Sequence, residues 1–186
     1  TNVDVEIAKL KAAKPDVIYF SGFVTDAVLI VKALGAQKVN IFGSVNGGGG
    51  YVDPKFLEMV GPLANYLCAA AQWNYDMDKS MEMEFNTKMR NLYGVDANHH
   101  SAILYSCVYV IKDALERVGT IDRDKVRDAI RATNITSGRA LTIPAKFIKF
   151  DERGENIGFD ILIAQCLEGK YHTVWPAEFK PKHNPV

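Results

Sequence analysis

The apolar residues near the start of the chain follow first a helical pattern and then a strand pattern. Residues 5–13 place Ile7 and Leu10 on one helical face, and the helix must stop before Pro15 because proline restricts the residue that precedes it. Residues 17–20 (VIYF) are an unbroken run of residues that favour β structure. They lack the alternation of apolar and polar residues that is typical of a strand with one solvent-exposed face. They predict a buried strand.

A helical pattern follows this strand after the short loop 21–24. The hydroxyl of Thr25 can cap the first turn of a helix that ends near Gly35. A strand, a loop and a capped helix form half of a parallel crossover, and parallel sheets bind ligands beyond the carboxyl ends of their strands. We therefore look for function in the loop 21–24, where Phe23 is an unusually large apolar residue.

The same order of strand and helix continues. A second strand is predicted at residues 39–42, before the glycines 47–50, and Pro54 suits the first position of the next helix. A third strand is predicted at residues 66–71. This alternation predicts an α/β fold in which helices cover a parallel sheet.

Helical patterns then dominate the middle of the chain. Residues 81–93 form an amphipathic helix that stops at Gly94, and residues 101–118 form a helix that is apolar nearly all round. Asp122 caps a further helix. A helix with apolar residues on every side must be covered on more than one surface. The chain does not supply a sheet for these helices, which indicates a fragment; a self-sufficient compact domain is the alternative.

The last part of the chain is predicted to be β structure. The segments are residues 146–150, 158–167 and 171–175, joined by turns, with a polar, loosely attached tail after Pro176.

Composition excludes several classes of function. Hydrophobic residues make up 48% of the chain and charged residues 24%, and the formal net charge is zero, which argues against nucleic acid as the main partner. No apolar run has the length of a membrane span, so membrane insertion is not expected. The chain has no nucleophile elbow, no paired carboxylates at a strand end and no cofactor fingerprint. We expect neither an enzyme nor a cofactor.

Five stretches, in order along nearly the whole chain, resemble the carboxyl-terminal half of type I periplasmic solute-binding proteins, in the branched-chain amino acid binding family of ABC importers. The stretches are LKAAKPDVIYFSG at residues 10–22, FGS at 42–44, ALERVG at 114–119, FDERGEN at 150–156 and GKYHTVWP at 169–176.

The resemblance implies a type I periplasmic-binding-protein fold: two lobes with doubly wound parallel sheets, joined by three crossings, here incomplete because the amino-terminal half is missing. Residues 1–72 would belong to the second lobe, 73–76 to a hinge crossing with Trp73, Asn74 and Tyr75, and 77–140 to the first lobe. Residues 141–176 would supply a further hinge strand and the returning β segments, and 177–186 the tail. Solute would be trapped between the lobes without chemistry.

The resemblance also places candidate ligand contacts after the first strand. Phe23 matches the family position where an aromatic ring closes over the solute, although it could instead pack within its own lobe. Ser21 and Gly22 offer a hydroxyl and a backbone N–H near the positive end of the following helix, where a carboxylate or amide could dock. Ser21 could also do no more than close the turn.

Val45 and Asn46 stand where amino acid binders of the family place an acidic residue for the ammonium group. No Asp or Glu occurs between Asp26 and Asp53. A buried ammonium without a counter-charge is costly, so an apolar solute that is neutral or carries a carboxylate, and that can be aromatic, fits better. The glycines 47–50 lack a phosphate-loop pattern and indicate a mobile loop.

His100 matches a family position that presents an aromatic residue from the first lobe to the cleft; a solvated loop is the alternative. Adjacent histidines point apart, and His99 and His100 have no carboxylate or cysteine at ligand spacing, so no metal is predicted.

The expected partners are a small-molecule solute (an amino acid or an aromatic or aliphatic carboxylate), an ABC permease, and either the missing half or a second copy of the chain. The expected location is the periplasm, or the outer surface of a Gram-positive cell with a lipid anchor. A ligand-sensing domain of a receptor or regulator with the same fold is the alternative function.

Overall fold

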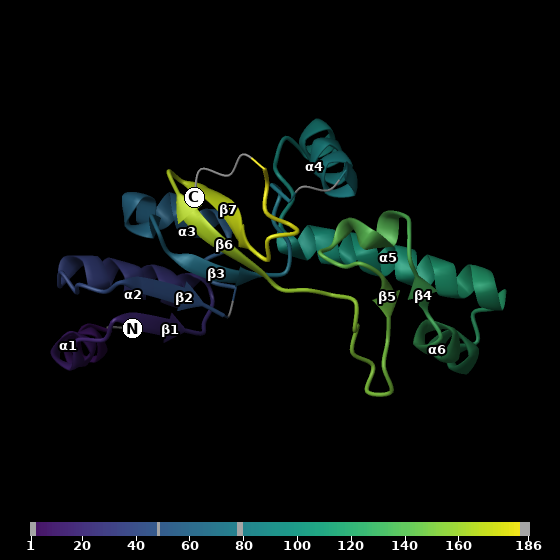
Figure 1. The fold of residues 1–186 in the computed structure, drawn as a ribbon, viewed down its shortest axis with the longest axis horizontal. Helices are drawn as coiled ribbons and strands as arrows, with labels where there is room; N and C mark the ends of the chain where they lie inside the picture. Colours follow the sequence, from purple (N-terminus) through teal and green to yellow (C-terminus); the bar gives the residue numbers. More distant parts are fainter. Residues whose placement is uncertain (1–2, 48, 78–79, 183–186) are drawn as a thin grey trace.

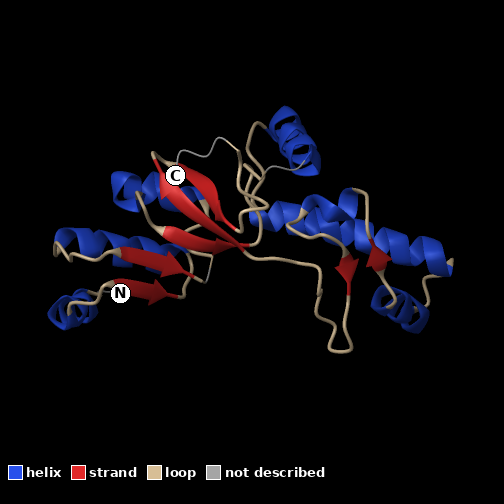
Figure 2. Ribbon diagram, viewed as in Figure 1, coloured by secondary structure: helices blue, strands red, loops and turns tan. Residues whose placement is uncertain are grey.

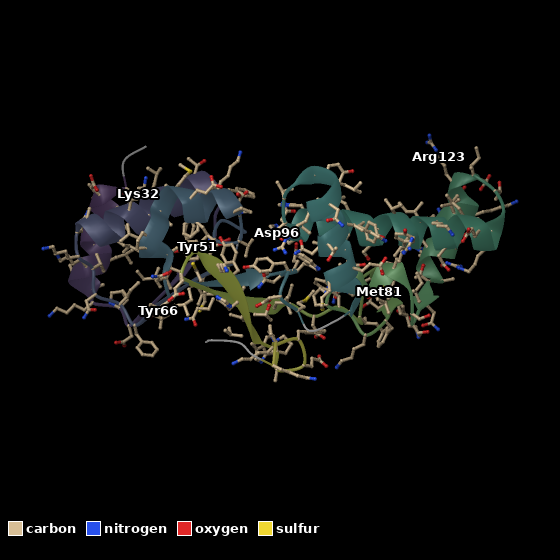
Figure 3. All side chains as sticks on the ribbon, turned by 90° about the horizontal axis from the view of Figure 1, so that it is seen from above. Lys32, Tyr51, Tyr66, Met81, Asp96 and Arg123 are labelled. Atoms are coloured by element: carbon tan, nitrogen blue, oxygen red, sulfur yellow. The ribbon has the colours of Figure 1, made fainter. Side chains whose placement is uncertain are left out.

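The computed structural model describes residues 3–47, 49–77 and 80–182. These residues form an elongated molecule with a five-stranded sheet and its helices at one end and a group of helices at the other (Figure 1). Viewed from above, Lys32, Asp96 and Arg123 lie in that order along the long axis (Figure 3). None of the described helices combines the length and the apolar composition that crossing a bilayer requires.

The end that contains the sheet is called the sheet part. Its elements are α1 (Asp4–Ala13), β1 (Val17–Phe20), α2 (Val24–Ala36), β2 (Gly43–Asn46), α3 (Pro54–Val60), the short 3-10 helix η1 (Gly61–Ala64), β3 (Cys68–Ala71), β6 (Leu162–Leu167) and β7 (Lys170–Trp175). The strand order is β1-β2-β3-β6-β7 (Figure 2). The first three strands are parallel, whereas β6 runs antiparallel to β3 and β7 antiparallel to β6.

The other end is called the helical part. It contains α4 (Ser80–Tyr93), α5 (His99–Val118), α6 (Arg123–Arg131), β4 (Asn134–Ile135), the 3-10 helix η2 (Arg139–Thr142) and β5 (Ile148–Lys149). Ile148 of β5 packs with Val110 of α5 and Ala140 of η2. The predicted β segment 146–150 therefore lies against α5 and pairs with β4, not with the five-stranded sheet. The predicted segment 158–167 rejoins that sheet only at Leu162, because Phe159 still forms a bridge with Ala145 (Figure 1).

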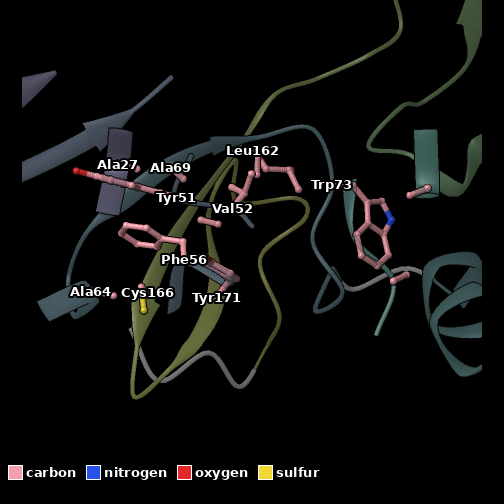
Figure 4. Packing of buried hydrophobic residues seen from close by; sticks show 14 of the residues in the cluster. Ala27, Tyr51, Val52, Phe56, Ala64, Ala69, Trp73, Leu162, Cys166 and Tyr171 are labelled. Carbon is pink, nitrogen blue, oxygen red and sulfur yellow. The ribbon is translucent and has the colours of Figure 1, made fainter. Parts of the chain in front are cut away.

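The main core lies on one face of the sheet and continues to Phe85 of α4 and Ala102 of α5 in the helical part. Tyr51 stacks on Phe56 of α3, with ring centroids 4.7 Å apart, and both pack with Ala27 of α2 (Figure 4). The expectation that β1 is buried on both faces was wrong, because Tyr19 is 71% exposed on the opposite face. The expected loose tail was wrong as far as Phe179, which is buried in the same core; residues 183–186 lie outside the described part of the chain.

The second strand begins four residues later than predicted. Val39 and Ile41 pack beside α1 and α2, and Phe42 is 93% exposed. The ladder with β1 starts only where Val17 pairs with Gly43. An apolar run predicts burial, but pairing with a neighbouring strand decides which residues become the strand. Residues 43–46, which were expected to follow the second strand, are the residues that form β2.

Only one side of α5 is covered within the described chain. Its buried residues include Ala102, Val110 and Ala114, whereas Leu104 and Val108 are largely exposed. The helix is apolar on both sides, as predicted, but no described element covers the second side. The neighbouring helix α6 has the predicted N-cap: Asp122 accepts a hydrogen bond from the N–H of Lys125 at 3.0 Å.

Candidate functional site

A cavity of about 350 Å³ lies where the sheet part meets the helical part; we call it the cleft pocket. Its sheet-side wall comes from the start of α2 and the residues after β2, and its opposite wall from the start of α5. The residues that line it are Phe23, Val24, Gly47, Gly49, Val52, Asp53, Ala70, Gln72, His99, His100 and Ile161. Gln72 and Ile161 belong to the segments that join the two parts.

Two long helices begin at this pocket. Phe23 is the N-cap of α2 and has an extended backbone, and its side chain cannot accept a capping hydrogen bond. The predicted cap by Thr25 was wrong, because the helix already begins at Val24. At α5 a capping box forms instead, in which the Asn98 side chain accepts from the N–H of Ser101 at 2.9 Å. Both helix N-termini bring partial positive charge to the pocket.

The loop of glycines is held by Asn46. Its Oδ1 accepts a hydrogen bond from the N–H of Gly50 at 2.9 Å, and the carbonyl of Gly22 accepts from the same N–H at 3.1 Å. A Cβ atom at Gly50 would lie 2.9 Å from the carbonyl oxygens of Gly22 and Phe23. Asn46 and Gly50 thus bring the loop against the start of α2; Gly48 lies outside the described residues.

Two of the six predicted ligand contacts line the cleft pocket. These two are Phe23 and His100. Phe23 has 78% of its surface exposed. The four that do not are Ser21, Gly22, Val45 and Asn46. Val45 lies within β2 on the open face of the sheet, paired with Tyr19, because the strand includes residues that were expected to follow it. Contact of Phe23 and His100 with a solute stays a prediction.

The pocket also contains residues that the sequence did not single out. Asp53 is the N-cap of α3, where its Oδ1 accepts from the N–H of Lys55 at 2.8 Å, and it is the one carboxylate in the described lining. Its cap position is visible in the sequence before Pro54 and Lys55, but its place in the pocket depends on the loop after β2.

His99 is the most buried charged or titratable side chain in the lining. It is 9% exposed, and its ring centroid lies 4.0 Å from that of His100. Burial lowers the pKa of His99, and the charge of His100 lowers it further, whereas Asp53 acts in the opposite direction. The lowered pKa favours the neutral form of the His99 imidazole as long as no charged ligand occupies the cleft pocket.

A second cavity of about 360 Å³ lies on the other side of Val52 and His99; we call it the hinge pocket. The predicted hinge residues Trp73, Asn74 and Tyr75 line it, and none of them lines the cleft pocket. Burial, followed by the charge of Asp76, raises the pKa of Tyr75 to about 12.

The segment after β3 is fixed by hydrogen bonds of two residues, Trp73 and Asp76. The indole N–H of Trp73 donates to the carbonyl of Thr142 at 3.0 Å. Asp76 accepts three hydrogen bonds, from the side-chain amide of Asn74 at 2.8 Å and from the N–H and hydroxyl of Thr173 at 2.9 and 2.5 Å. These contacts tie the first crossing to η2 and to β7.

Within the described residues, no three side chains of His, Cys, Asp or Glu gather in a way that could hold a metal ion. The polar groups of the cleft pocket are instead suited to hydrogen bonding with a small molecule: two imidazoles, one carboxylate, one amide and two helix N-termini.

Comparison with known sequences adds to this geometry. The sequence model of a family described as periplasmic binding protein matches residues 1–169. The Leu/Ile/Val-binding protein homolog 7 of Brucella suis is 28% identical over 176 residues, which cover 91% of this chain and 43% of that protein. The leucine-, isoleucine-, valine-, threonine-, and alanine-binding protein of Pseudomonas aeruginosa is 24% identical over 84% of this chain and 40% of its own length. The chain thus spans less than half the length of these relatives.

Solved structures share the fold. A leucine-binding protein from Thermotoga maritima superposes with a TM-score of 0.81 at 21% identity, over 94% of this chain and 48% of that one. A solute-binding protein of an ABC transporter from R. palustris, in complex with benzoate, superposes with a TM-score of 0.74 at 17% identity, over 92% of this chain and 46% of that one.

Proposed function

Because the chain belongs to the periplasmic binding protein family, we propose that it is part of the extracytoplasmic solute-binding component of an ABC importer. In this proposal the cleft pocket captures a small apolar carboxylate or an amino-acid-like solute. Its partners are that solute and the permease of the importer. The protein holds the solute without altering it.

The observation that carries this proposal is the position of the cleft pocket between two parts of the chain. Phe23 and Val24 approach from the sheet part, and His99 and His100 approach from the helical part. Gln72 and Ile161, on the joining segments, complete the wall. A rotation of one part relative to the other changes the shape of such a pocket, as in domain closure around a ligand.

The size and lining of the pocket agree with a small solute. Its volume of about 350 Å³ is at the lower end of the range for ligand sites. Micromolar capture needs about 8 kcal/mol. Contact with the exposed ring of Phe23 and a few charge-assisted hydrogen bonds supply a free energy of that order.

The relatives support this class of solute. The names of the Brucella and Pseudomonas relatives specify leucine, isoleucine and valine for those proteins, the Pseudomonas name adds threonine and alanine, and benzoate is bound to the R. palustris neighbour. Both kinds of molecule combine an apolar group with a carboxylate, which matches a pocket that has an aromatic ring at one side and hydrogen-bond donors at the other.

A ligand screen tests the proposal. The complete polypeptide that contains this chain is heated with leucine, valine, benzoate, isovalerate and their amides, and its unfolding temperature is recorded. A binder raises that temperature in a concentration-dependent way, because it stabilises the folded state only. Absence of any shift, together with turnover of one of these compounds, would replace solute capture with an enzymatic function.

A further inference from the structure

His99 combines three properties that set it apart in the cleft pocket. It is nine-tenths buried, its imidazole makes no hydrogen bond with any residue that the structure describes, and it lines both the cleft pocket and the hinge pocket. A buried polar side chain is normally hydrogen-bonded. An imidazole without a partner at the wall of a cavity is therefore poised to bond to what enters the cavity.

The surrounding backbone favours a negatively charged group at the same place. His99 is the first residue of α5, and its own N–H and that of His100 precede the first hydrogen bonds of the helix. The first turn of α2, which begins next to Phe23 on the other wall, has no side-chain cap. The N–H groups of His99 and His100, those of the uncapped first turn of α2, and the imidazole of His99, which bonds to no described residue, thus face one cavity.

We propose that the imidazole of His99 donates a hydrogen bond to the carboxylate of the solute in the cleft pocket, with the first turns of α2 and α5 on either side of that carboxylate. This inference rests on the proposed function and deepens it: the solute class is an organic acid whose carboxylate points toward the start of α5. The apolar end of the solute lies toward Phe23.

Binding of this kind is linked to protonation. The charged or titratable side chains that share a cavity wall with His99 are His100 on α5, Asp53 and Glu58 at α3, Arg90 on α4, Asp96 and Lys170. Arg90 and Asp96 are paired with each other at 2.5 Å, so their charges offset. The phenols of Tyr75 and Tyr171, whose pKa values are raised by burial, are neutral.

The sign of the pH dependence follows from these neighbours. Without solute, the pKa of His99 is lowered, mainly by burial. A carboxylate beside the ring favours the imidazolium and raises that pKa. Binding therefore takes up a proton, and affinity for the acid increases as the pH falls through the interval between the two pKa values, by at most about tenfold per pH unit for one linked proton. At higher pH the neutral ring still donates from one nitrogen, and affinity levels off.

The experiment compares matched acids and amides. Dissociation constants are measured by calorimetry on the complete polypeptide for benzoate and benzamide, and for isovalerate and isovaleramide, between about pH 5 and about pH 8, where histidines titrate. The variants are His99→Gln and, as the matched control, His172→Gln on β7, which lies outside both pockets.

Four results support the inference. Wild-type affinity for an acid rises toward low pH while affinity for its amide does not. His99→Gln weakens binding of the acid by about tenfold or more at low pH and removes the pH dependence. Amide binding stays within about twofold, which also shows that the variant is folded. His172→Gln retains the pH dependence of the wild type.

Two results overturn it in distinguishable ways. Acid binding that is independent of pH and unchanged in His99→Gln removes His99 from recognition and leaves solute capture intact. Failure of all four compounds, and of the amino acids in the ligand screen, to bind at any pH overturns the proposed function and this inference together.

Discussion

The indole N–H of Trp73 donates to the carbonyl of Thr142 across 3.0 Å and thereby joins two segments that are far apart in the sequence. Trp73 lies just after β3, where the chain leaves the sheet, and Thr142 ends η2 in the helical part. Trp73 also packs edge-on against Phe85 of α4, with ring centroids 6.1 Å apart. The Trp73 side chain thus links the end of β3 to η2 and α4 of the helical part.

Replacing Trp73 by Phe is expected to destabilise the protein. The substitution leaves the buried carbonyl of Thr142 without its donor, which costs about 1–3 kcal/mol of unfolding free energy. Denaturant titration measures this loss. Trp175→Phe is the matched control, since Trp175 is 56% exposed and is expected to change stability by less than about 0.5 kcal/mol. Equal effects of the two variants would show that the bond to Thr142 contributes nothing.

Phe23→Ala is expected to weaken solute binding without unfolding the protein. The ring is exposed and lines the cleft pocket, so its loss removes about 1 kcal/mol or more of binding free energy. Calorimetric titration with the solute that the screen identifies measures the change. Phe42→Ala, an exposed aromatic residue outside the cleft pocket, is the control. Unchanged affinity would exclude Phe23 from the contacts.

Gly50→Ala is expected to disturb the wall of the cleft pocket. An added Cβ would lie 2.9 Å from two backbone oxygens and from the Cβ of Ala27, so the loop must move, at a cost of about 1–3 kcal/mol. Gly43→Ala is the matched control, because nothing lies within 4 Å of its added Cβ. Unfolding curves of both variants, with solute affinity, provide the comparison. Equal stability would mean that the loop accommodates a side chain freely.

Stability is expected to fall between pH 10 and about pH 12, partly through Tyr75. Its pKa in the folded protein is raised from 10.0 to about 12, so in this interval the unfolded chain releases a proton that the folded protein retains. The contribution is fully present below pH 10 and is lost as the pH rises toward 12. Unfolding free energies of Tyr75→Phe should fall less steeply there than those of Tyr93→Phe, an exposed control. Parallel slopes would contradict the assignment to Tyr75.

The isolated chain of 186 residues is expected to self-associate through α5. Leu104 and Val108 are largely exposed and Ile111 is about half exposed on one side of that helix, where their spacing makes them neighbours on an apolar surface. Sedimentation of the double variant Leu104→Lys, Val108→Lys should show more monomer than the wild type. Met59→Lys on α3 removes an exposed apolar residue elsewhere and serves as control. A monomeric wild-type chain would contradict the expectation.

The sequence predicted well those elements whose signals are local. The helix α4 ends at Tyr93, before a glycine with a positive φ of 72°, and β1 has the predicted bounds. The family and the α/β fold of type I periplasmic binding proteins were also predicted correctly, as the family match and the superposition on solved structures show. The assignment of residue ranges to lobes and hinges stays a prediction.

Features that depend on pairing between distant segments were predicted less well. Val39 and Ile41 have the composition of a strand, but Lys38 adopts a left-handed conformation and the ladder with β1 begins at Gly43. Asp53 and His99 share the cleft pocket only because the loop after β2 and the start of α5 meet in space. No local pattern records such a meeting, so the sequence supplied Phe23 and His100 but not these two.

The chain leaves the sheet after Ala71 and re-enters it at Leu162, and these two residues are directly paired on adjacent antiparallel strands. Everything from residue 72 to residue 161 is therefore, in topological respects, a large insertion at the tip of a hairpin. A tight two-residue turn has the reach to connect the same two strand ends. The protein without residues 72–161 would keep all five strands in order. Its folding would show whether the sheet forms without the inserted segment.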